Sequence, residues 1–169
     1  TAYLNLGAFK VLENTLNKIQ KLRILVGKEQ EQSFVLTNKL FDEVQQALSG
    51  GEEKPQEIQK WKSFLEREEV EIRVYSKGFL HGKAYLLEGE GISPAGAVGF
   101  VGSSNFTGAG LTTNLELNAV LMQPSAVSEL RNWFETLWNE SDDYKQEILE
   151  MLTRFARTYT PYEIYIKIL

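Results

Sequence analysis

The sequence predicts an α/β fold in which a mixed β-sheet is flanked by helices. The first observation is a set of short apolar or alternating runs typical of strands, at residues 22–27, 70–76, 83–87, 97–102 and 115–122. The second is a set of helix-prone stretches at 8–20, 37–49 and 55–68, and again from Pro124 onward and at 143–157. Helices therefore precede and follow a group of closely spaced strands, as expected for a sheet covered by helices.

Each element rests on a local pattern. Phe9, Leu12, Leu16 and Ile19 recur at helical spacing, and the run LRILVG, which ends at Gly27, is typical of a buried strand. The segment SGGEEKP separates two helix-prone stretches, and VEIRVYS alternates apolar and polar residues like a strand with one wet face. A proline at 161 fits the first turn of a last helix.

The composition is that of a soluble globular protein. A length of 169 residues corresponds to one ordinary domain, and no apolar run reaches the roughly 18 to 20 residues of a membrane span. The absence of cysteine excludes disulfides and thiolate metal sites, and a single histidine argues against a histidine-based metal site. We therefore expect a cytoplasmic protein with no metal and no membrane partner.

The ends and the charge of the chain suggest a wider context. The sequence does not begin with Met and stops inside the apolar run YEIYIKIL, so we expect a piece of a longer protein. Residues 1–158 are predicted to form the domain, and 159–169 to begin a segment that leads into a missing downstream region. The net charge of −5 comes from an acidic stretch at 129–150, and the rest of the chain is balanced, which leaves room for a nucleic-acid-binding face.

The first candidate for chemistry is the pair His81 and Lys83 in FLHGKAYLL. Residues two apart on a strand point to the same face, so imidazole and ammonium would form a compact cationic site suited to a phosphate. An imidazole can also attack phosphorus or carry a proton near neutral pH. The pair alone is explained more simply as a polar strand end beside a solvated charge. Lys77 stands just before it, either lining the same site or as ordinary surface charge.

Two further segments supply polar groups. GFVGSSNFTGAG runs from an apolar strand into Ser103, Ser104 and Asn105, whose small polar side chains can donate to phosphate oxygens. NLELN places Glu116 on the wet face of the next strand, where a carboxylate can orient an imidazole. Taken singly, these segments also fit a turn with a helix cap and an ordinary amphipathic strand.

Together, the His-x-Lys pair, the acid Glu88, the GSSN run and the NLELN run resemble the phospholipase D superfamily. The resemblance implies an αβα sandwich of the phospholipase D and nuclease type. It implies that His81 is a nucleophile that forms a phosphohistidine and that Glu116 is the acid that holds it in position. Lys83 and Asn105 would bind the phosphate with support from Ser103 or Ser104, and no metal or other cofactor would be needed.

The sequence departs from the family pattern in two places. Glu88 stands where the family motif has aspartate, an acid that is commonly structural. The motif also occurs once, although the family builds one active site from two copies. Single-motif members solve this by forming a dimer about a two-fold axis, so the resemblance implies a homodimer in which His81 faces His81 of a second copy.

Further stretches resemble one subgroup, the phospholipase D-like domain at the N-terminus of bacterial superfamily II DNA and RNA helicases. These are LRILVGKE, HGKAYLLEG, GSSNFTGAGLTTNLELN, NWFETLW and TPYEIYIKIL. No GxxxxGK[ST] phosphate loop occurs, so ATP would serve only the absent helicase region.

The predicted function is a metal-independent nuclease acting on nucleic acid, with DNA the expected substrate. The alternative is a weakly active or inactive nucleic-acid-binding module, and a lipid phosphodiesterase is disfavoured because no membrane-facing segment is evident. Trp133 and Trp138 are interpreted as core residues rather than base-stacking platforms.

Overall fold

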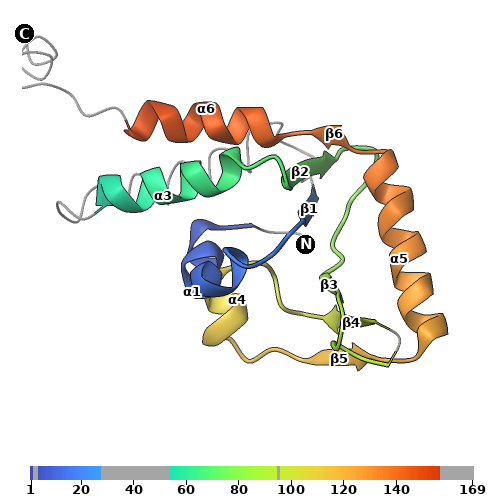
Figure 1. Ribbon diagram of the computed structural model, residues 1–169. Helices are drawn as coiled ribbons and strands as arrows, with labels where there is room; N and C mark the ends of the chain where they lie inside the picture. The colour runs from blue at the N-terminus through green and yellow to red at the C-terminus, as the bar shows by residue number, and fades with distance from the viewer. Residues whose placement is uncertain (2–3, 28–53, 95, 157–169) are drawn as a thin grey trace, which may run out of the picture.

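The computed structural model describes residues 1, 4–27, 54–94 and 96–156. The predicted α/β class is confirmed, with strands between helices on two sides. Figure 1 shows α1 (Leu6–Leu16) beside α4 (Gly108–Thr112) on one side of the strands and α5 (Pro124–Asn139) on the other. A second pair, α3 (Lys54–Glu66) and α6 (Lys145–Ala156), lies side by side at one end (Figure 1). No helix in the described part of the chain is both long and apolar enough to span a bilayer.

The strands form two three-stranded sheets rather than one continuous sheet. In the first, β1 (Leu22–Gly27) pairs in parallel with β2 (Val70–Tyr75), and β2 pairs with the short antiparallel strand β6 (Asp142–Asp143). The run LRILVG is a buried strand as predicted, because it lies in the core and carries no charged side chain except Arg23. The strand β6 was not predicted, since two consecutive aspartates give no strand pattern.

The second sheet is an antiparallel meander of β3 (Ala84–Glu88), β4 (Ala97–Gly102) and β5 (Asn118–Leu121). Tyr85 stands opposite Phe100, and Phe100 opposite Val120. The predicted strand at 115–122 is shorter than expected, because the Leu117 N–H bonds to a side chain, although the Leu117 carbonyl oxygen still accepts from the Ser103 N–H at 3.1 Å. The backbone N–H of Leu117 donates to the Ser103 hydroxyl, and regular pairing starts at Asn118.

Two apolar clusters hold the layers together. The larger one fills the space between the first sheet and helices α1, α3 and α6, with Val26, Ile58 and Leu152 fully buried. The smaller one seats α5 through Trp138, which packs against Leu25 of β1 and Leu80. Burial of these apolar side chains is the main favourable term in folding, and it fixes the position of α5 relative to both sheets.

The remaining predicted elements follow with small shifts. Helices predicted at 8–20, 55–68 and 143–157 are observed at Leu6–Leu16, Lys54–Glu66 and Lys145–Ala156. Pro124 opens α5 as predicted, since proline is favoured in the first turn. The helix predicted at 37–49, the last helix from 161 and the domain boundary at 158 lie outside the described residues. Helix α4 was not predicted, because its glycines disfavour a helix; Thr107 caps it by accepting from the Gly110 N–H at 2.9 Å.

Candidate functional site

The segment 79–83 connects the two sheets and carries the predicted histidine. It runs beside the end of β1, so closely that a side chain at Gly27 would collide with the Leu80 carbonyl oxygen. Leu80 is buried in the cluster beneath α5, and Gly82 faces the Trp133 ring. The Lys83 Nζ atom and the Phe79 ring both contact the His81 ring, so the three side chains form one cluster in which Phe79 and His81 are exposed and Lys83 is buried.

His81 and Lys83 are in direct contact. The Nζ atom of Lys83 lies 2.8 Å from Nε2 and 2.9 Å from Nδ1 of His81, and it donates to the His81 carbonyl oxygen at 3.0 Å. His81 is exposed, whereas Lys83 is only 8% exposed. Burial lowers the pKa of Lys83 below its ordinary value, and the negative charge of Glu116 opposes that shift. An anion placed against this pair would favour the charged form of the lysine.

Glu116 belongs to a network of hydrogen bonds beside the pair. Its carboxylate accepts from the Ser103 hydroxyl and, at 3.2 Å, from the side-chain amide of Asn114. The Ser103 hydroxyl in turn accepts from the Leu117 N–H at 3.0 Å. Within the described residues no hydrogen bond joins Glu116 to His81. The carboxylate acts on Lys83 through its charge, since it raises the pKa of Lys83 against the effect of burial.

Ser104 is the buried hydroxyl of the site. Its Oγ accepts from the Asn118 side-chain amide at 2.8 Å, and its carbonyl oxygen accepts from the Tyr85 hydroxyl at 3.0 Å. Burial and the nearby Glu116 charge raise the pKa of Tyr85 to about 12, so this phenol stays protonated and remains a donor. The side-chain oxygen of Asn105 accepts from the Thr1 hydroxyl at 3.4 Å.

Gly102 allows the two halves of the site to meet. A Cβ atom at this position would lie within 3.0 Å of the Leu117 carbonyl oxygen and of two Asn118 atoms. The Gly102 N–H also donates to the Lys83 carbonyl oxygen at 3.1 Å. The backbone at Gly102 therefore lies too close to the backbone at the start of β5 to leave room for a side chain. This close approach brings Ser103 and Glu116 together.

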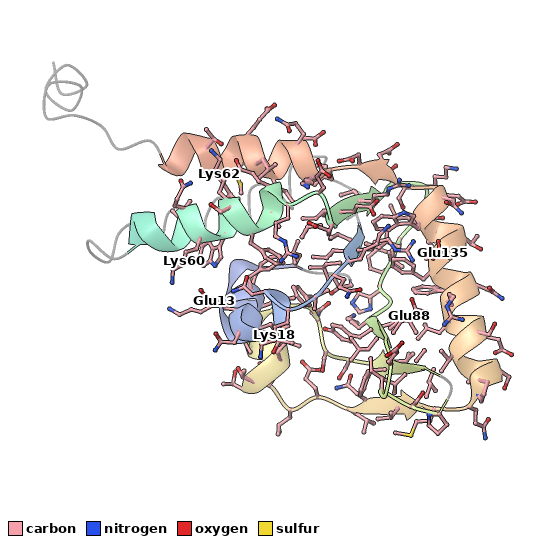
Figure 2. All side chains as sticks on the ribbon, in the orientation of Figure 1. Glu13, Lys18, Lys60, Lys62, Glu88 and Glu135 are labelled. Atoms are coloured by element: carbon pink, nitrogen blue, oxygen red, sulfur yellow. The ribbon has the colours of Figure 1, made fainter. Side chains whose placement is uncertain are left out.

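Two of the acidic and basic residues singled out in the sequence lie apart from this network. Glu88 ends β3 and accepts from Arg131 of α5, at 2.8 Å from Nε and 2.6 Å from Nη2. Figure 2 shows Glu88 on the side of β3 that faces α5. The residue in place of the family's aspartate therefore ties helix to sheet and makes no contact with His81. Lys77 is exposed and forms no hydrogen bond or ion pair with the described residues.

Three residues of the site region had no predicted role. Tyr85 and Asn118 were seen only as strand residues, because no sequence pattern indicates which alternating side chain meets a serine at the end of the neighbouring strand. Phe79 is 61% exposed, and its ring stacks on the His81 ring with centroids 5.5 Å apart and planes 13° apart. Trp138 is buried as predicted, but the prediction for Trp133 was wrong: its side chain is 41% exposed and covers Gly82.

No cluster of three or more His, Cys, Asp or Glu side chains arranged to hold a metal ion occurs among the described residues. The polar groups that do converge are an ammonium, an imidazole, hydroxyls, side-chain amides and one carboxylate, which accepts. The ammonium and the hydroxyl and amide donors suit an anion better than a cation.

Comparison with known protein families gives a match over most of the chain. Residues 8–138 match the family described as "Cardiolipin synthase, PLD-like domain", where PLD stands for phospholipase D. A comparison with curated proteins found no match. The matched region covers well over half of the chain and contains His81, Lys83, Ser103, Ser104, Asn105 and Glu116. The chain therefore belongs to the phospholipase D-like family.

Proposed function

We propose that this domain is a metal-independent phosphodiesterase that cleaves nucleic acid, with DNA as the expected substrate, through a phosphohistidine on His81. The observation that carries the proposal is the contact between Lys83 and the ring of His81. It puts a cation and a nucleophile at the same point, where a phosphate would meet both.

The reaction has two steps. A ring nitrogen of His81 attacks phosphorus, and the bond from phosphorus to the leaving oxygen breaks. His81 of a second copy gives that oxygen a proton. Water then attacks the phosphohistidine while the second histidine takes up the water's proton, which frees His81 and releases a phosphomonoester. Lys83 neutralises charge on the phosphate oxygens throughout, and Asn105 and Ser104 add donors around them, while the Ser103 hydroxyl is held by Glu116.

Glu116 would support both steps through its effect on Lys83. Its charge favours the protonated form of Lys83, and its bonds to Ser103 and Asn114 keep the carboxylate in place. Lys77, exposed just before the histidine, would contribute long-range attraction for a phosphate backbone.

The second copy follows from the chemistry, since the chain has one histidine and the mechanism uses two. A two-fold axis close to His81 would bring the two imidazoles to one phosphate. We further propose that the domain works in the cytoplasm as part of a larger DNA or RNA helicase, in which ATP is used only by the helicase region. Its role there would be to cut or hold the strand that the helicase handles.

The direct test is incubation with single-stranded DNA, duplex DNA, RNA and phosphatidylglycerol vesicles, all in EDTA, with His81→Ala in parallel. Cleavage of nucleic acid that disappears in His81→Ala supports the proposal, and a phosphoramidate trapped on His81 by acid-free mass spectrometry would identify the intermediate. Products that form equally with His81→Ala would refute it. Turnover of the vesicles alone would assign the site to lipid phosphodiesters.

A second candidate is a nucleic-acid-binding module with little or no turnover. The single histidine favours it, because one copy of the site holds a nucleophile without a second imidazole to protonate the leaving group. Salt-dependent binding of DNA by a protein that sediments as a monomer and forms no product would favour this candidate.

A further inference from the structure

We propose that Phe79 forms a stacking site for an unpaired nucleobase next to His81, so that the substrate is a single strand or a strand with a base turned out of the helix. This inference rests on the proposed function and specifies its substrate. The ring of Phe79 lies almost parallel to the His81 ring, with 13° between the planes and 5.5 Å between centroids. That is the offset-stacked arrangement that aromatic rings favour.

The exposure of Phe79 is unusual for its position. Single exposed apolar residues are common on protein surfaces and need no explanation by themselves. Here, however, the neighbour Leu80 is buried in the cluster beneath α5, whereas the Phe79 ring contacts the His81 ring, which in turn contacts Lys83. Its side chain is 61% exposed, so most of the ring is open to a ligand at the site.

The chemistry of the two neighbouring groups matches a nucleotide. Lys83 and His81 offer a cation and an imidazole for a phosphate, and Phe79 offers a flat apolar face beside them. A nucleoside joined to that phosphate through one sugar carries a flat ring of the kind that stacks on aromatic side chains. The glycerol and acyl chains of a phospholipid have no such ring, so this arrangement favours a nucleic acid.

The base must be unpaired to use this face. In a duplex, each base is covered on both sides by its neighbours and cannot lie against Phe79 without leaving the stack. A single strand has no such cost, and stacking on an aromatic residue tolerates every base because each has a π-face. We therefore expect a preference for single strands with little dependence on sequence.

The experiment compares Phe79→Leu and Phe79→Trp with the parent protein on two oligomers of equal length. One is oligothymidylate, and the other has the same sugar-phosphate backbone without bases. Affinity is measured by fluorescence anisotropy in a His81→Asn background, which prevents turnover and keeps a planar side chain beside Phe79. Loss of a stacked base costs roughly 5- to 100-fold in affinity. We expect that loss for Phe79→Leu on oligothymidylate only, with Phe79→Trp close to the parent.

Two controls complete the design. Val11→Ala removes part of another exposed apolar side chain, on helix α1, and is expected to change neither affinity. Affinity of Phe79→Leu for a blunt duplex is expected to equal that of the parent. An equal loss on both oligomers, or no loss on oligothymidylate, would overturn the proposal. A second result would also overturn the proposal. If Phe79→Leu, in protein that keeps His81, lowers kcat and shifts the pH profile but leaves KM unchanged, Phe79 only positions the histidine.

The outcomes separate this inference from the proposed function. If the parent protein cleaves nothing, the proposed function fails, while the binding comparison still decides the stacking site. If cleavage depends on His81 but the KM for oligothymidylate is the same with Phe79→Leu, the function stands and the stacking site is wrong.

Discussion

The Nζ atom of Lys83 lies within hydrogen-bonding distance of both ring nitrogens of His81, at 2.8 and 2.9 Å, while its own side chain is almost fully buried. The structure therefore places a buried lysine side chain directly against an exposed imidazole.

Removal of this ammonium is expected to abolish most of the activity. Lys83→Met should lower kcat by about 100-fold or more, the usual cost of losing one donor to a developing negative charge. Lys83→Arg should not restore it, because the planar guanidinium does not fit the space of the smaller ammonium. The measurement is phosphodiester cleavage, with thermal unfolding as a check of the fold. Activity of Lys83→Met close to the parent level would contradict the proposed phosphate site.

Gly102→Ala is expected to disturb both folding and activity. The new Cβ atom would meet the backbone of Leu117 and Asn118, which cannot move without shifting Glu116. Overpacking of this kind costs roughly 1–3 kcal/mol in the free energy of unfolding. Gly89→Ala is the matched control, since its Cβ would meet only the end of the flexible Ile92 side chain. A Gly102→Ala protein with parent stability would show that the close approach is not required.

Glu88→Asp tests the departure from the family motif. The shorter carboxylate should lose the contacts with Arg131 and so weaken the attachment of α5 to β3. For an exposed ion pair this should lower the free energy of unfolding by about 0–1 kcal/mol. We expect cleavage to be unchanged, because Glu88 makes no contact with His81. Arg131→Met should have the same effect on unfolding, and the double variant no more than either single one. A Glu88→Asp protein that folds normally but loses activity would make Glu88 part of the site.

The pair Arg23 and Glu135 gives stability a pH dependence. Arg23 of β1 holds Glu135 of α5 by two hydrogen bonds, at 3.0 and 2.5 Å (Glu135 is labelled in Figure 2). The hydrogen bond from Arg23 lowers the pKa of Glu135 below its ordinary 4.5. The unfolded chain then binds the proton more readily, so the stabilisation is present above that ordinary value and is lost as the pH falls through the folded value.

Glu135→Gln should therefore lower the free energy of unfolding by roughly 0.5–1 kcal/mol at neutral pH, with the difference fading toward zero in acid. Urea unfolding at several pH values measures it. Thr136→Ala is a suitable control on the same helix, since the Thr136 hydroxyl bonds only to the helix backbone and carries no titrating group. A difference that persists unchanged in acid would contradict the role of the charge.

Local patterns determined most of the elements. LRILVG, AVGFVG and the helix opened by Pro124 lie where their periodicity and turn residues predicted. The failures have physical causes. The strand expected from Leu115 starts only at Asn118 because the Ser103 hydroxyl takes the Leu117 N–H, and Trp133 is exposed because α5 turns it toward Gly82 rather than into the core.

The sequence by itself determined which residues carry the candidate chemistry, because the spacing of His81, Lys83 and the GSSN run is a local property of the chain. Only the tertiary structure decided how they meet. The contact of Ser103 with Glu116, the role of Glu88 as a tie to Arg131, and the open ring of Phe79 beside His81 depend on how strands and α5 pack. The first two contacts join residues 13 and 43 positions apart in sequence, and packing at close range, rather than local preference, selects them. Phe79 and His81 are only two residues apart, and there the structure decides that the rings stack and that the Phe79 side chain stays exposed.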